Sequence, residues 1–232
     1  MKWILLSALV FLTACASIVQ PTTFMIETNS ISGIGADLKK QYMLLPLNEN
    51  LTFDDLEFSE YALHVAFALE QQGYEIAEGE PEVVIVLDYG IGDAQTKNYS
   101  YSVPTFGQTG SIGSTTYGSI SSTGNISATT TNIPTYGITG SNSYSSSYDV
   151  YTRYINIMAF DNKEIDQSGK AKQLWITKVK STGTSNDLRR VFPIMMSMAS
   201  KYLGKDTGQT MKDSVTENSS IVMNFKNRIK AK

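Results

Sequence analysis

The chain has 232 residues, with 19 Lys and Arg against 22 Asp and Glu, and a formal net charge of −3. This mild acidity gives no electrostatic case for binding nucleic acid, which needs a basic surface. The length permits one domain with a sizeable hydrophobic core, or two small ones. Because Cys15 is the only cysteine, no disulfide bond can form within one molecule.

The N-terminus has the pattern of a bacterial lipoprotein signal peptide. Lys2 precedes a mostly apolar run from Trp3 to Leu12, which is too short to span about 30 Å of hydrocarbon. The run ends in Leu-Thr-Ala-Cys, the lipobox at which such proteins are cut between Ala14 and Cys15 and lipidated on the cysteine. Several acyl chains, at about 0.8 kcal/mol per buried methylene, make such an anchor effectively permanent.

The sequence also predicts where the anchored protein resides. Cys15 is followed by Ala16, whereas an aspartate there would favour retention in the inner membrane. We therefore expect a lipid-anchored protein of the bacterial outer membrane that faces the periplasm; the alternative is an ordinary secreted protein that is cut elsewhere. The predicted organisation is a signal peptide over residues 1–14, a lipidated anchor and tether over 15–21, and a single domain over 22–232.

Strands and one helix are predicted in the first part of this domain. Thr22–Glu27 and Gln41–Leu47 are short β-prone runs separated by a glycine-containing turn. A helix is predicted from Asp54 to Gly73, because an acidic N-cap is followed by a glutamate three residues later and by apolar residues at helical spacing. The unbroken β-branched run Val83–Leu87 predicts a strand that is buried on both faces or nearly so.

The middle of the chain has a different composition. No residue from Asn98 to Tyr148 is charged, and Ser, Thr, Gly and Tyr dominate. The segment Pro104–Ser111, PTFGQTGS, recurs as Pro134–Ser141, PTYGITGS. Two copies are too few for a solenoid, which needs about three or more units to bury a core. The sequence therefore predicts a low-complexity insertion at about 98–148 that forms a long protruding hairpin with matching segments in its two arms.

The C-terminal part again predicts regular structure. Asp149–Phe160 and Lys172–Thr182 are expected strands, joined through a polar turn over Asp161–Gly169. A second helix is expected from Asn186 or Asp187 to about Leu203, and Ile221–Phe225 is interpreted as a possible edge strand. The predicted fold is α+β, an antiparallel or mixed sheet with two helices packed on one face.

Several of these segments resemble a family of bacterial envelope lipoproteins that carry a domain of unknown function. The resemblance lies in Leu56–Ala62, Gly73–Tyr74, Pro81–Val84, Tyr89–Gly92 and Asp187–Pro193. It implies a similar fold and a location in the envelope. It carries over no catalytic residue.

No motif indicates an enzyme, a cofactor or a metal site. The single histidine, His64, lies mid-helix with no serine or cysteine nucleophile motif, which favours a structural role. Asp88 ends an apolar strand and is a candidate for a carboxylate-dependent hydrolase, although aspartates there commonly solvate turns. The oxygen-rich Asp161–Asp166 lacks the glycine and glutamate of a calcium loop. We therefore expect a non-enzymatic protein that needs no cofactor.

The aromatic residues of the middle region form the candidate interaction surface. Aromatic faces among hydroxyl groups can stack on glycans, and β-prone segments can add strands to a partner. The candidates are Tyr99, Tyr101, Phe106, Tyr117, Tyr136, Tyr144 and Tyr148. The expected partner is an envelope protein, with peptidoglycan or glycan binding as the alternative. A flexible insertion that merely tolerates neutral residues is the remaining interpretation.

Overall fold

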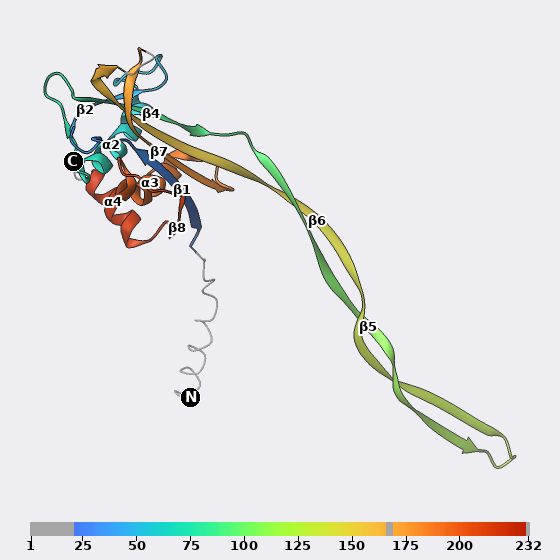
Figure 1. The fold of residues 1–232 in the computed structure, drawn as a ribbon. Coiled ribbons are helices and arrows are strands. Elements are labelled where there is room, and N and C mark those ends of the chain that lie inside the picture. The colour runs from blue at the N-terminus through green and yellow to red at the C-terminus, as the bar shows by residue number, and fades with distance from the viewer. Residues whose placement is uncertain (1–20, 166–168, 231–232) are drawn as a thin grey trace, which may run out of the picture. The chain divides into compact units, whose positions relative to one another are not determined.

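A computed structural model describes residues 21–165 and 169–230 (Figure 1). The chain divides into two compact units. Residues 95–149 form one unit, which we call the hairpin, and the described residues on either side of this range form the other, which we call the core domain. The predicted signal peptide, its cleavage site at Ala14 and the lipidation site at Cys15 lie outside the described residues.

The core domain is built on a mixed β-sheet with strand order β3-β2-β4-β6-β7-β1-β8. Its strands are β1 Thr23–Ser32, β2 Gln41–Pro46, β3 Glu75–Ile76, β4 Val83–Ile91, β6 Ile126–Ile165, β7 Ala171–Gly183 and β8 Met211–Thr216. Strand β2 pairs in parallel with β3 and β4, and the other pairs of this order are antiparallel. The α+β class and the mixed sheet agree with the sequence prediction.

Helix α2, Leu56–Glu70, lies in the connection between β2 and its two parallel neighbours, β3 and β4. Parallel neighbours require such a crossover, because the chain must return to the same end of the sheet. The N-cap is Asp55, whose carboxylate accepts a hydrogen bond from the Phe58 N–H at 2.9 Å, so the helix begins one residue later than the Asp54 start that we predicted. Gly73 follows the helix with φ 78°, a left-handed conformation that suits glycine.

Burial alternates along the central strands. In β4, Val83, Ile85 and Leu87 are at most 1% exposed, whereas Val84 and Val86 are only half-buried. Complete burial on both faces, the stronger form of the prediction, is therefore not found: one face is buried and the other is half-buried. Successive side chains point to opposite faces of a sheet, and in this sheet one face is buried much more completely than the other.

The described part of the chain has three α-helices rather than the two that we predicted. The other two are α3, Leu188–Ala199, which continues into a 3₁₀ turn over Ser200–Tyr202, and α4, Ser220–Lys230. Residues Ile221–Phe225, which we expected to form an edge strand, belong to helix α4. The edge strand next to β1 is β8. Val222 and Phe225, 0% and 5% exposed, lie three residues apart and therefore share one face of a helix.

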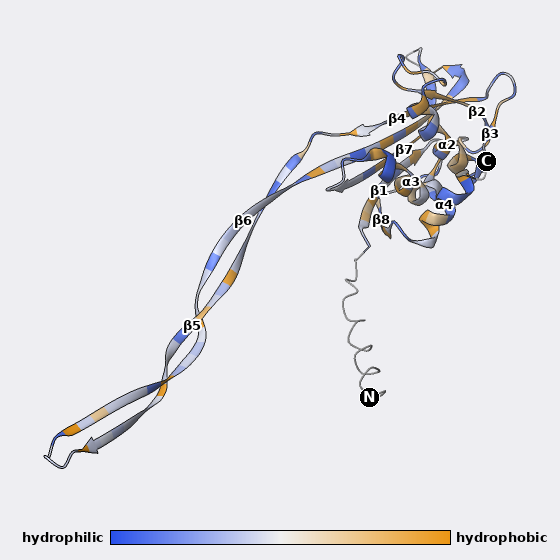
Figure 2. Ribbon diagram, turned by 180° about the vertical axis from the view of Figure 1, so that it is seen from behind, coloured by the Kyte–Doolittle hydropathy of each residue, from blue (hydrophilic) through white to orange (hydrophobic). Residues whose placement is uncertain are grey.

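The hairpin consists of β5, Gln95–Ile120, and the first part of β6, which begins at Ile126. A short turn joins them, in which the Ser121 N–H donates to the Asn125 carbonyl at 2.9 Å and Gly124 has φ 82°. The left-handed glycine completes the three-residue connection of an antiparallel hairpin. No residue in 95–149 is buried, and Figure 2 shows isolated hydrophobic residues along an otherwise pale or hydrophilic ribbon.

Candidate interaction surface

The aromatic residues near the open end of the hairpin form a ladder. Tyr99 and Tyr101 alternate with serines along β5, so their rings share one face of the strand. The Tyr99 ring lies 6.1 Å from Tyr101 and 6.0 Å from Tyr148, and the Tyr101 ring lies 5.6 Å from Tyr144. Each of these four side chains is still about half exposed, 47–49%. The ladder therefore leaves aromatic surface free for a partner.

The alternate positions of the same segment carry hydroxyl groups. The Ser100 and Ser145 hydroxyl oxygens are 3.4 Å apart, and those of Ser102 and Ser143 are 3.2 Å apart. At the end of the strands, the Thr96 hydroxyl donates to Asp149 at 2.8 Å. Cross-strand pairs of this kind hold the two strands together, and each contributes roughly 0.2–1 kcal/mol to the stability of the pairing.

The two copies of the repeated segment lie opposite each other. The Thr109 hydroxyl is 3.3 Å from both the carbonyl oxygen and the hydroxyl of Thr135. In the reciprocal contact, the Thr139 hydroxyl donates to the Thr105 carbonyl at 3.3 Å. The second residue of each copy thus meets the sixth residue of the other, and the pairing has an approximate two-fold symmetry.

Glycines make this pairing possible. A Cβ atom on Gly107 would come within 3.1 Å of Thr139 Cγ2, and one on Gly137 would come within 3.2 Å of Thr109 Cγ2. Threonine from one copy therefore packs on glycine from the other, in both directions. The repeat is self-complementary when it pairs with itself in antiparallel orientation.

The other predicted aromatic residues do not join the ladder. Phe106, Tyr117 and Tyr136 are 74%, 73% and 74% exposed. The threonine and glycine contacts of the repeats involve odd-numbered positions, so Phe106 and Tyr136, at even-numbered positions between them, point to the opposite face of the hairpin. Tyr117 lies nearer the turn, next to Thr116, whose hydroxyl is 2.9 Å from that of Thr130. The seven predicted residues thus form separate groups.

Sequence reasoning missed the aliphatic part of this face. Ile138 lies on the same face as Phe106 and Tyr136 and is 62% exposed, and Ile112, Ile120 and Ile126, nearer the turn, are 74–77% exposed. These isoleucines stand among serine and threonine, and the low-complexity composition obscured them. We call Phe106, Tyr136 and Ile138 the apolar face of the hairpin.

Both outer edges of the hairpin are unpaired in the described residues. Strand β5 pairs only with β6, and β6 pairs with β4 and β7 only from Tyr151 onward. The outward backbone N–H and C=O groups of residues 98–148 therefore have no neighbouring strand, and no charged side chain lies in that range. Such an edge readily accepts another strand.

The core domain also contains candidate residues. His64 Nδ1 lies 2.8 Å from the Glu60 carbonyl oxygen, and its ring packs beside Phe192 and Phe225, with burial lowering its pKa. Asp88 accepts a hydrogen bond from the Asn156 amide at 2.9 Å, so its recorded partner is an amide rather than a second carboxylate. These contacts fit structural roles.

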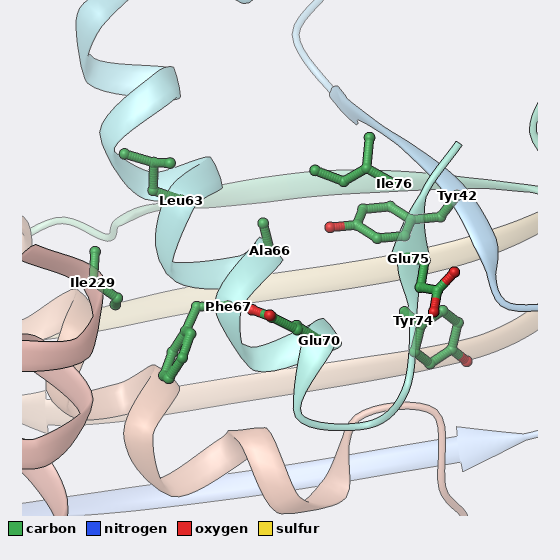
Figure 3. Close-up of a pocket in the computed structure, with 9 residues that line it drawn as sticks. All are labelled: Tyr42, Leu63, Ala66, Phe67, Glu70, Tyr74, Glu75, Ile76 and Ile229. Carbon is green, nitrogen blue, oxygen red and sulfur yellow. The ribbon is translucent and has the colours of Figure 1, made fainter. Parts of the chain in front are cut away.

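An apolar cavity of about 370 Å³ lies beside α2 (Figure 3). Tyr42 from β2, Ala66 from α2 and Ile76 from β3 are among its walls, and they also line an adjoining cavity of about 320 Å³. Burial, together with the negative charge of Glu70, raises the pKa of Tyr42 to about 12.

Two charged residues are buried in the core domain. Arg153, 1% exposed, donates to the Ser185 carbonyl at 2.8 Å and to the Ser181 hydroxyl at 2.9 Å, and burial lowers its pKa. Asp161 pairs with Lys39 and accepts two backbone N–H groups, from Lys163 and Glu164. Neither residue lies in the hairpin.

The described residues contain no cluster of three or more His, Cys, Asp or Glu side chains that could hold a metal ion. In the same part of the chain, every helix is too short or too polar to cross a lipid bilayer.

Comparison with known proteins gives little for this chain. No family model and no curated protein matches it, so the resemblance to envelope lipoproteins stays a prediction. A solved structure of a PDZ domain protein from Parabacteroides distasonis ATCC 8503 aligns with 12% identity and a TM-score of 0.37, over 86% of this chain and 41% of that chain. This chain therefore spans less than half the length of that protein, and so low a TM-score supports no argument about fold or function.

Proposed function

We propose that this protein is a non-enzymatic lipoprotein of the bacterial outer membrane whose hairpin binds another envelope component. The lipobox at Cys15 supports the anchor. The observation that carries the interaction role is the apolar face of the hairpin together with its tyrosine ladder. These side chains are exposed on a two-stranded element that has no core of its own, and exposed apolar patches on folded proteins commonly mark interaction sites.

Anchoring is tested by metabolic labelling with palmitate. The full chain should incorporate label and fractionate with outer membranes, whereas Cys15→Ser should do neither. Incorporation of label into Cys15→Ser would contradict the assignment of the lipidation site.

The interaction role is tested by deletion of Thr105–Ser141 in cells, followed by chemical cross-linking of the envelope. The core domain should remain folded, which the fluorescence of the buried Trp175 reports, and the cross-linked species should disappear. A matched variant replaces Tyr99, Tyr101, Tyr144 and Tyr148 by serine, and its control replaces Ser100, Ser102, Ser143 and Ser145 by alanine. Unchanged cross-linking after the deletion would remove the hairpin from the function.

Glycan binding is the second candidate. The observation that favours it is the high exposure of Phe106, Tyr117 and Tyr136, whose rings lie among hydroxyl side chains. Aromatic rings with free faces stack on sugar rings. Isolated peptidoglycan should retain the folded, unlipidated chain, and replacement of the three aromatic residues by serine should abolish retention. No retention of the folded parent chain would count against this function.

A further inference from the structure

The outer edges of β5 and β6 are both unpaired in the described residues, and each strand carries one copy of the repeat. An isolated two-stranded hairpin is at best marginally stable in water, and a third strand or a packed layer normally stabilises it. Within residues 95–149 neither is present, because every side chain there is exposed or half-buried. The hairpin thus has neither a third strand nor a packed layer of its own to stabilise it and to cover its apolar face.

The way the two repeat copies pair within the hairpin shows what kind of strand fits its edges. Thr105–Thr139 and Thr109–Thr135 contacts form when one copy lies antiparallel to the other. Glycines at Gly107 and Gly137 give the opposing threonines room. Any strand that carries the same segment in antiparallel orientation can make these contacts again on a free edge.

We infer that the partner is a second copy of this chain, and that β5 of one copy pairs with β6 of the next along their outer edges. This inference rests on the proposed function and names its partner. When two hairpins lie side by side and point in the same direction, β5 of one is antiparallel to β6 of the next. The first repeat of one copy then faces the second repeat of its neighbour, as it does within one hairpin.

Charge and side-chain placement both permit this arrangement. In natural proteins, lysine or inward-pointing charges on an edge strand usually prevent it from pairing with other chains. No residue from Asn98 to Tyr148 is charged, so this protection is missing here. In-phase pairing also places the apolar faces of successive hairpins side by side, because the side-chain alternation continues from strand to strand. The contact joins different surfaces of the two copies, so it extends into a closed ring or an open filament.

The test uses two full-length, lipidated chains with different tags, coexpressed in the same cells. One carries Thr109→Cys and the other carries Thr135→Cys. Cys15 is consumed by lipidation, so the introduced thiols are the only free ones. We expect a disulfide-linked heterodimer, about ten-fold above a control pair of core-domain variants, Thr52→Cys with Thr210→Cys, because pairing raises the local thiol concentration.

A third variant confirms that the hairpin has formed. Thr109→Cys and Thr135→Cys in one chain should give an intramolecular disulfide, since the two hydroxyl oxygens are 3.3 Å apart. With that disulfide present, absence of the heterodimer would overturn the inference. A disulfide-linked homodimer of Thr109→Cys alone would overturn the β5–β6 arrangement, because it requires β5 to meet β5.

Failure of this inference is distinguishable from failure of the proposed function. If no heterodimer forms but deletion of Thr105–Ser141 still removes envelope cross-links, the hairpin binds a different molecule and self-pairing is wrong. If neither the cysteine pair nor the deletion has an effect, both proposals are wrong.

Discussion

The core domain buries its large apolar side chains, whereas the hairpin leaves its own exposed to solvent. In the core domain, residues such as Phe58, Ile157 and Phe192 are 0% exposed, and helices and sheet bury them against one another. In the hairpin, Phe106 and Ile112 are 74% and 76% exposed, and no side chain is buried. The core domain is therefore stabilised by burial of its own apolar side chains, whereas the hairpin is held by cross-strand contacts and leaves its apolar side chains exposed.

The largest expected contrast comes from one substitution made in both regions. Phe192→Ala removes a ring whose centroid lies 4.5 Å from Tyr61 and 6.0 Å from Tyr89, and it should lower the free energy of unfolding by about 3–5 kcal/mol. Phe106→Ala should leave that value within about 0.5 kcal/mol. Urea denaturation followed by Trp175 fluorescence measures both. A similar loss for both variants would contradict the division into two regions.

A turn in the core domain gives the next largest effect. Gly204 has φ 68°, and a Cβ there would lie 2.9 Å from the Tyr74 hydroxyl oxygen. Gly204→Ala should therefore cost about 2–3 kcal/mol, combining left-handed backbone strain with overpacking. Gly208→Ala is the matched control, since φ is 63° but a Cβ would have no atom within 4 Å; it should cost about 1 kcal/mol. Equal losses in urea denaturation would show that the Tyr74 contact is irrelevant.

Acid should destabilise the core domain through Asp161. Burial raises the pKa of this carboxyl, but Lys39 and two backbone N–H groups lower it more, to about 2 from an ordinary 3.8. A folded pKa below the unfolded one gives stability above pH 4 that is lost as the pH falls toward 2, at most about 2 kcal/mol after solvent screening.

The control for this pH dependence is Asp161→Asn, which should be less stable at pH 6 and should lose less stability between pH 4 and pH 2. Urea denaturation over this range measures both proteins. Residues 98–148 contain no charged group, so amides within that range should show no matching acid transition. If the free energy of unfolding fell equally with pH in Asp161→Asn and in the parent chain, Asp161 would not be the cause of the acid destabilisation.

The smallest expected effect is confined to the hairpin. Gly107→Val places side-chain atoms where Thr139 Cγ2 lies, 3.1 Å from a Cβ, whereas a Cβ on Gly113 has no atom within 4 Å. Gly107→Val should weaken hairpin pairing by about 1 kcal/mol and speed amide exchange there several-fold. Gly113→Val should not, and neither should change core-domain unfolding. Equal exchange in the two variants would contradict the packing of threonine on glycine.

The sequence predicted those elements whose signals are local. Helix α2 has its capping aspartate and its glycine stop, and β4 is an unbroken apolar run, so both were found within a few residues. Burial of β4 on one face was not predictable, because the distribution of helices over the sheet depends on tertiary packing. Helix α4 was missed because Ile221–Phe225 is short, and a short apolar segment gives no clear choice between helix and strand.

The candidate surface was predicted only in part. The tyrosine ladder follows from alternation of tyrosine and serine, which is visible in the sequence. Which residue of one strand meets which residue of the other depends on register, so the pairing of Thr109 with Thr135 and the shared face of Phe106 and Ile138 required the structure.

Amide hydrogen exchange would show whether pairing with other copies stabilises the hairpin. The lipidated full chain would be measured in lipid vesicles at low and at high surface density. We expect amides of residues 98–148 to become more protected as the density rises, while core-domain amides stay unchanged. Hairpin protection that is the same at both densities would contradict it.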